Sequence, residues 1–252
     1  MKHNLLIIII LCIFTALPSC KRAPLTIGPI VTQTRELDDF SELYLNDNIN
    51  LSLVRSDTCY IEITTGKNII DNITTEVNDG VLTINNNTTL NWLRPYDYQL
   101  DATLYYKDIF FLMFTASGTL VSENNYNGVP EGNHYYTIIV DGGSGDIDLN
   151  VNDCKRLHIY YKYGTSRLTL HGDNNQTISV NKKSYGIFDA RNCAAQKVII
   201  NSMSSYSDCF VNATERLDAT INGAGNIYYK GDPDTISVTY GEFAKGKLIH
   251  LE

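Results

Sequence analysis

Two aspartates, Asp148 and Asp189, occupy equivalent positions in a repeated segment and are the carboxylates best placed for acid–base chemistry. If neighbouring repeats stack as β-strands, two interstrand steps separate them by roughly 9 to 10 Å. That spacing lies near the upper limit for the two carboxylates of an inverting glycosidase. No arginine or lysine cluster accompanies them in the pattern, and outward aspartates are usually solvated. We therefore expect no enzyme and assign no catalytic residue, with a polysaccharide lyase or hydrolase as the alternative.

The segment 141–148 reads Asp-Gly-Gly-Ser-Gly-Asp-Ile-Asp and resembles a cation-binding loop. Calcium-binding β-rolls repeat Gly-Gly-x-Gly-x-Asp in tandem, and EF-hand loops need a glycine at position six and a glutamate at position twelve. Here Ile147 replaces the aspartate of a single copy, and Val151 and Leu157 occupy the two EF-hand positions. The histidines lack metal-ligand spacing, and no Cys-x-x-Cys pair occurs. The sequence predicts no metal and no cofactor, and it favours a glycine-rich corner.

Tyrosine is unusually abundant, at 17 residues, and Tyr185 and Tyr206 share one position of the repeat. Rows of exposed aromatic rings can stack on sugars or form protein-binding hot spots. Rings on neighbouring strands can also stack on one another and stiffen a sheet. Tyr185 and Tyr206 are therefore the candidate ligand-binding residues, with mutual stacking as the alternative interpretation.

A period of about twenty residues positions these side chains. Its anchors are small residues at spacings of 21, 20, 21 and 18: Gly145, Ser166, Gly186, Ser207 and Gly225. Two residues after each anchor comes an apolar one: Ile147, Leu168, Phe188, Cys209 and Ile227. A second strand in each unit has inward apolar positions that begin at Leu157, Ile178, Val198, Leu217 and Ile236, the last followed by Val238. This pattern predicts an all-β fold, a right-handed parallel β-helix-like solenoid with rungs of about twenty residues.

The N-terminus carries the features of an export signal. Residues 1–19 begin with a short polar stretch and continue in an apolar run from Leu5 to Ala16, the length of a signal peptide. The run ends in Leu-Pro-Ser-Cys, which resembles the lipobox of bacterial lipoproteins. That resemblance implies cleavage before Cys20 and its attachment to diacylglycerol.

The rest of the chain divides by its regularity. Residues 20–35 are the expected lipidated tether, and residues 36–252 are the expected solenoid domain. Within this domain, 36–105 is less regular and 106–245 repeats clearly.

Charge and cysteine content limit the partners and the covalent links. The formal net charge of −8 argues against nucleic acid and against an anionic lipid surface. Export permits disulfides, and three full pairings remain open among Cys59, Cys154, Cys193 and Cys209. Cys209 occupies an inward position of the repeat and is predicted to be a free core residue.

The chain also resembles a known family. The similarity lies in the entry at Phe40–Leu43, the strand at Ile49–Val54, the Gly-Ser-Gly-Asp at 143–146, and the ending at 221–233. These segments are similar to the lipoprotein family named putative auto-transporter adhesin, head GIN domain, over roughly residues 36–245. The middle copies of the repeat depart from the family pattern. The resemblance implies a β-helix-like fold at the cell envelope and little biochemistry.

Together these observations predict a non-catalytic envelope lipoprotein, an adhesin-like binding or structural module whose ligand is unknown. The expected location is the outer membrane, with the periplasmic and the surface face both open. The expected partners are the membrane, through the lipid anchor, and a glycan or an envelope or host protein. Self-association through end rungs into a homo-oligomer is a further alternative.

Overall fold

The computed structural model describes residues 26–89, 91, 94, 98–127 and 135–252. In these ranges the fold is all-β, as predicted, with a short 3-10 helix, η1 (Ile70–Asn72), among the strands. No helix in these ranges is long and apolar enough to cross a membrane. The predicted signal peptide, 1–19, and the predicted lipidation site, Cys20, lie outside the described residues.

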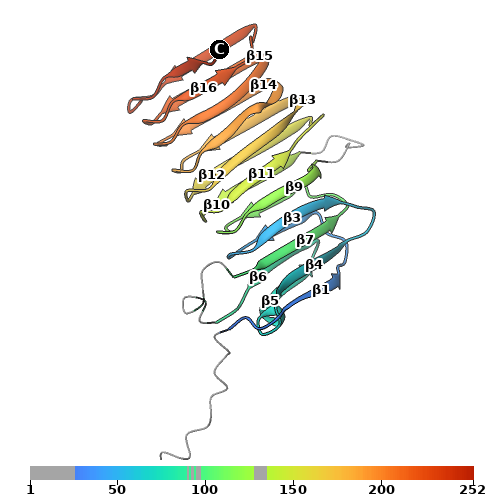
Figure 1. The fold of residues 1–252 in the computed structure, drawn as a ribbon. Coiled ribbons are helices and arrows are strands. Elements are labelled where there is room, and N and C mark those ends of the chain that lie inside the picture. Colours follow the sequence, from blue (N-terminus) through green and yellow to red (C-terminus); the bar gives the residue numbers. More distant parts are fainter. Residues whose placement is uncertain (1–25, 90, 92–93, 95–97, 128–134) are drawn as a thin grey trace, which may run out of the picture.

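Eighteen strands in the described ranges belong to one hydrogen-bonded sheet (Figure 1). The first nine are β1 (Ile30–Glu36), β2 (Glu42–Leu45), β3 (Asn50–Arg55), β4 (Tyr60–Gly66), β5 (Ile73–Asn78), β6 (Val81–Asn86), β7 (Leu100–Tyr106), β8 (Phe111–Phe114) and β9 (Leu120–Asn125). The others are β10 (Tyr136–Asp141), β11 (Asp146–Asn150), β12 (Arg156–Tyr163), β13 (Arg167–Lys182), β14 (Phe188–Met203), β15 (Cys209–Asn222), β16 (Ile227–Lys230), β17 (Thr235–Tyr240) and β18 (Leu248–His250).

The strands stack in two parallel ladders. The first ladder runs β6, β2, β8, β10, β12, then the second halves of β13, β14 and β15, and ends at β17. The second runs β7, β3, β9, β11, then the first halves of the same long strands, and ends at β16 and β18. The long strands β13 to β15 pass through both ladders, which joins them into one sheet.

The N-terminal end of the stack differs in direction and in order. Antiparallel strands terminate both ladders there, β5 against β6 in the first and β4 and β1 beyond β7 in the second. The first unit along the chain, β2 and β3, lies inside the stack, because β6 and β7 pair on one side of it and β8 and β9 on the other. The chain therefore completes its lower end before it builds upward.

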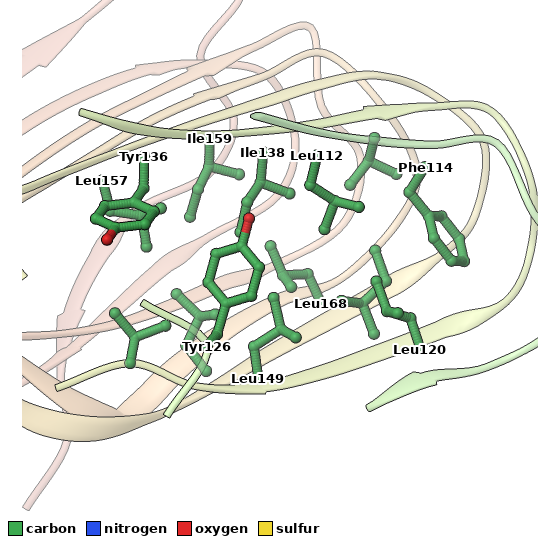
Figure 2. Close-up of a cluster of buried hydrophobic side chains, with 14 of the residues drawn as sticks. Leu112, Phe114, Leu120, Tyr126, Tyr136, Ile138, Leu149, Leu157, Ile159 and Leu168 are labelled. Carbon is green, nitrogen blue, oxygen red and sulfur yellow. The ribbon is translucent and has the colours of Figure 1, made fainter. Parts of the chain in front are cut away.

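The core lies between the two ladders and consists of side-chain columns in register. One column of adjacent pairs runs Leu120, Ile147, Leu168, Phe188, Cys209 and Ile227, all buried. On the facing ladder, Leu112, Ile138 and Ile159 pair in register, and Figure 2 shows them directed toward Leu120, Leu149 and Leu168. The predicted repeat register, from Ile147 to Ile227, is confirmed.

The small anchor residues lie at tightly stacked corners. A Cβ added at Gly145 would overlap the carbonyl oxygen of Gly118 in the unit below, and one at Gly225 would overlap that of Ser207. Backbone therefore rests on backbone at these corners, which leaves no room for a larger side chain. Only a small residue fits at these two corners, which accounts for the glycine anchors there.

One predicted pair of core positions is wrong. Ile236 and Val238 continue the inward columns in register with Leu217 and Ala219, but their exposed fractions are 44% and 39%. Every residue of β17 is exposed, because among the described residues no further strand lies beyond it in the first ladder. Alternation identified the face of the strand correctly but could not show that the stack stops there.

Candidate functional site

Tyr185 and Tyr206 lie at successive corners, between β13 and β14 and between β14 and β15, each one residue before its anchor. Their ring centroids are 5.4 Å apart and their planes differ by 8°. The exposed fractions are 63% and 67%, so the rings stack on each other and still present an apolar face to solvent. Both interpretations of the pair, mutual stacking and exposure for a ligand, are compatible with this geometry.

Two surface hollows flank Tyr206. One of about 400 Å³ lies toward the second ladder, and one of about 410 Å³ lies toward the corner that follows β17. The first is lined by Arg167, Ile187, Arg191, Tyr206, Ser207, Asp208 and Phe210. The second includes Ser204, Tyr206, Asn222, Glu242, Phe243 and Lys245. Tyr206 therefore separates two hollows that combine aromatic rings with charged and amide groups, a lining suited to polar ligands with apolar faces.

A second aromatic pair borders the first hollow. Phe210 of β15 stacks on Tyr228 of β16, with centroids 5.0 Å apart and planes 14° apart. The guanidinium carbon of Arg191 lies 3.9 Å from the Phe210 ring centroid, a cation–π contact. These residues were not predicted from the sequence, although Phe210 and Tyr228 directly follow the inward Cys209 and Ile227. The period that predicts the core therefore also places these two aromatic residues at equivalent positions on the outer face.

The two aspartates lie in register, as predicted, with Thr169 between them. Their charges are engaged separately: an oxygen of Asp148 lies 3.0 Å from Nε2 of His171, and one of Asp189 lies 2.9 Å from Nε of Arg191. Arg191 follows Asp189 by two residues on the same face and is the basic neighbour of that carboxylate. In this arrangement each carboxylate has its own basic partner.

A buried lysine was missed by the sequence analysis. Lys182 continues the inward alternation of Ile178 and Val180 and is fully buried. Its Nζ lies 2.6 Å from Oγ of Ser207 and also donates to Oγ of Ser205 and to the Ser184 carbonyl. Burial lowers the pKa of Lys182 below its ordinary value of 10.5, an effect that Cys209 and Asp208 partly oppose.

A serine beside a lysine is also the arrangement by which some hydrolases activate a nucleophile. Here the ammonium is surrounded by oxygen acceptors, which favours its charged form. The Ser207 hydroxyl donates to the Gly186 carbonyl at 2.7 Å, so its proton is directed to the corner backbone. The contacts thus connect the two consecutive corners that carry Tyr185 and Tyr206.

The cysteines and the glycine-rich corner have contacts that account for them as structural elements. Cys59, Cys154, Cys193 and Cys209 are buried free thiols, which confirms the prediction for Cys209. Burial raises the pKa of Cys193 to about 12 and that of Cys209 to about 11, which disfavours the reactive thiolate. In the predicted corner, the Asp141 carboxylate pairs with Lys162 at 2.9 Å. Across the described residues, no three His, Cys, Asp or Glu side chains gather as a metal site.

The fold and this surface define a class: an all-β protein of stacked parallel strands with an aromatic edge along its corners. The family described as "Putative auto-transporter adhesin, head GIN domain" matches residues 39–233. The chain belongs to this family, as the resemblance in its sequence predicted. A search of curated proteins finds no match.

Solved structures show the same fold. A structure named a putative adhesin, from Bacteroides fragilis, is 21% identical with a TM-score of 0.72, and the match covers 88% of this chain and 97% of that one. A structure named a putative lipid binding protein, from Parabacteroides distasonis, is 22% identical with a TM-score of 0.57, covering 89% and 98%. A putative adhesin from the same species is 19% identical with a TM-score of 0.53, covering 89% and 98%. At these identities the likeness concerns the fold.

Proposed function

We propose that this protein is a non-catalytic binding module of the bacterial cell envelope. The observation that carries the proposal is the exposed Tyr185–Tyr206 stack, whose Tyr206 borders two surface hollows. Flat rings held parallel and open to solvent offer area at little cost in conformational entropy, which suits sugar rings or extended protein segments. Membership of a family described as adhesins supports a role in binding at the envelope.

The scaffold in this proposal is a right-handed parallel β-helix-like solenoid. In support, β12 to β15 repeat in parallel register and Gly145 and Gly225 stack on the corners below them. Right-handed crossover is the strong preference where a strand returns parallel to its predecessor. Each unit then buries its apolar columns only against the units above and below, which keeps outward positions available for binding.

Attachment to the outer membrane through lipidated Cys20 completes the proposal. The Leu-Pro-Ser-Cys sequence at the end of the apolar run supports it. Two or more acyl chains give durable anchoring, since each buried methylene contributes about 0.8 kcal/mol. Labelled fatty acid should enter the wild-type chain and not the Cys20→Ser variant. Equal labelling of both chains would reject the anchor, and protease treatment of intact cells would distinguish the surface from the periplasmic face.

The binding role is tested with the aromatic stack. The double variant Tyr185→Ala/Tyr206→Ala should lose at least about tenfold in affinity for glycans or envelope proteins that the wild type binds on an array, since hot-spot aromatics contribute about 2 kcal/mol or more. Tyr163→Ala is the matched control, because Tyr163 is equally exposed but lies at the preceding corner. Unchanged binding by the double variant would reject the stack as the binding surface.

An enzymatic outcome would replace the proposal. Purified protein should leave polysaccharides intact; depolymerisation that disappears in Asp148→Asn or Asp189→Asn would establish catalysis instead.

A further inference from the structure

We infer that β17, the last strand of the first ladder, is a docking edge for a second copy of this chain, paired across a two-fold axis. β17 hydrogen-bonds to β15 alone, so its opposite edge presents backbone N–H and C=O groups with no strand beside them in the described residues. Such an edge is a template for another strand. This inference concerns a surface separate from the tyrosine stack of the proposed function.

The side chains of this edge are those of an interior strand. In the column below, Leu157, Ile178, Val198 and Leu217 are buried, and the next member is Ile236, at 44% exposed. Val238 and Tyr240 follow on the same face and are also exposed. Proteins usually protect exposed edges with charged residues, proline or bulges, and β17, reading Thr-Ile-Ser-Val-Thr-Tyr, contains none of these.

The other end of the molecule explains why the partner is another C-terminal end and not the base of the next molecule. The edge strands there are β1, which carries Arg35 and Glu36, and β5, which carries Glu76, and both run antiparallel to their neighbours. Charged edges of this kind are poor counterparts for Ile236 and Val238. A contact between two like ends is isologous, so it closes as a dimer and does not extend into a filament.

A two-fold axis at Val238 produces a self-complementary register. In antiparallel pairing, Val238 faces Val238 of the second copy, and Ile236 faces its Tyr240, so apolar side chains meet on the core face. The ends of the edge carry opposite charge. The turn before β17 holds exposed Asp232 and Asp234, whereas the corner after it holds exposed Lys245 and Lys247 against one glutamate. Antiparallel pairing brings the acidic end of each edge beside the basic end of the other.

Cysteine cross-linking of the full chain in isolated membranes tests both the partner and the register. Residues paired directly across antiparallel strands are about 4.5 to 5.5 Å apart at Cα, within the range that a disulfide spans. On oxidation, Val238→Cys should give a disulfide-linked species of twice the chain mass, at least about fivefold above the exposed control Thr34→Cys of β1. Ile236→Cys alone should stay near the control level, and Ile236→Cys/Tyr240→Cys should cross-link. The native chain, whose Cys59, Cys154, Cys193 and Cys209 are buried, gives the background.

Each other outcome overturns the inference. A folded Val238→Cys chain, shown by the β-sheet circular dichroism of the native chain, that stays at the level of Thr34→Cys would exclude the two-fold edge. Equal cross-linking at residues 34, 236 and 238 would indicate random collision. A disulfide between Val238→Cys and a protein of different mass would assign the edge to another partner.

Discussion

The two ends of the stack differ in how the last strands are covered. At the N-terminal end, antiparallel strands terminate the ladders and Arg35 of β1 bonds to the carbonyls of Ile70 and Ile73, which connects one ladder to the other. At the C-terminal end, β17 and β18 follow the repeat without a change of direction, and Ile236 and Val238 remain exposed. The comparison shows that a repeat fold does not terminate itself, and that a specific device is needed where an end is to be closed.

The largest effect on stability is expected for a substitution inside the stack, where the units above and below leave no room for a larger side chain. Gly145→Val would place a branched side chain against the Gly118 carbonyl, so the corner must separate from the one below. We expect a loss of more than about 4 kcal/mol in the free energy of unfolding, or no soluble folded protein. Denaturant titration followed by circular dichroism measures it. Gly80→Asn is the control, because a Cβ at that turn meets open space and asparagine tolerates its positive φ of 77°.

Apolar truncations compare the interior with the open end directly. Phe188→Ala removes a fully buried ring and should cost about 3 to 5 kcal/mol of unfolding free energy. Ile236→Ala removes a half-exposed side chain and should cost less than about 1 kcal/mol in dilute protein. Similar costs for the two variants, measured by the same titration, would mean that β17 is as well covered as the interior.

The closure of the N-terminal end is tested at Arg35. Arg35→Met keeps much of the aliphatic length but removes the donors to the Ile70 and Ile73 carbonyls. Because bonds from a charged donor to partly buried carbonyls are lost, unfolding should become easier by about 1.5 to 3 kcal/mol. Hydrogen exchange should rise in β1 and β5 and stay unchanged in β17. Equal acceleration at both ends would show that Arg35 has no specific capping role.

The smallest effect is expected at the corner lysine. Lys182→Met removes the bonds to Ser184 and Ser207 but also the cost of burying a charge, so the net loss should be about 1 kcal/mol. The folded pKa of Lys182 lies below 10.5, so the unfolded chain binds more protons between these values. The wild type should therefore gain stability over the variant as pH rises through that window. A difference that is constant with pH would mean that burial does not shift this pKa.

The sequence predicted the local features of the fold but not the features that depend on residues distant in the chain. The alternation at Cys209 and Ile227 predicted one buried column, because each side chain packs on its equivalent one repeat away. It could not predict that β3 lies between β7 and β9, since Leu51 meets Leu120 through a reversal of stacking order and not through the period. The predicted burial of Ile236 was wrong for a related reason. Alternation shows which face of the strand a residue lies on, whereas burial also requires a further strand to cover it.

The candidate site divides in the same way. Tyr185 and Tyr206 were selected because they repeat, and the structure stacks their rings. Phe210 and Tyr228 repeat too, but they were not predicted, because the period is strongest in the inward residues beside them. Lys182 lies at an inward position of the pattern, and its role became visible only because the fold brings Ser205 and Ser207 beside it from the next corner.

Because β1 and β17 lie at opposite ends of the stack, the number of repeats between them sets the length of the molecule (Figure 1). Strands in a ladder are about 4.8 Å apart, so each twenty-residue repeat inserted between β10 and β15 would lengthen the molecule by that increment. Under the proposed anchoring through Cys20, the tip would move away from the membrane in equal steps while the base and the tip kept their own chemistry. Relatives with different numbers of repeats would then act as spacers of graded length, each presenting the same tip at a different distance from the bilayer.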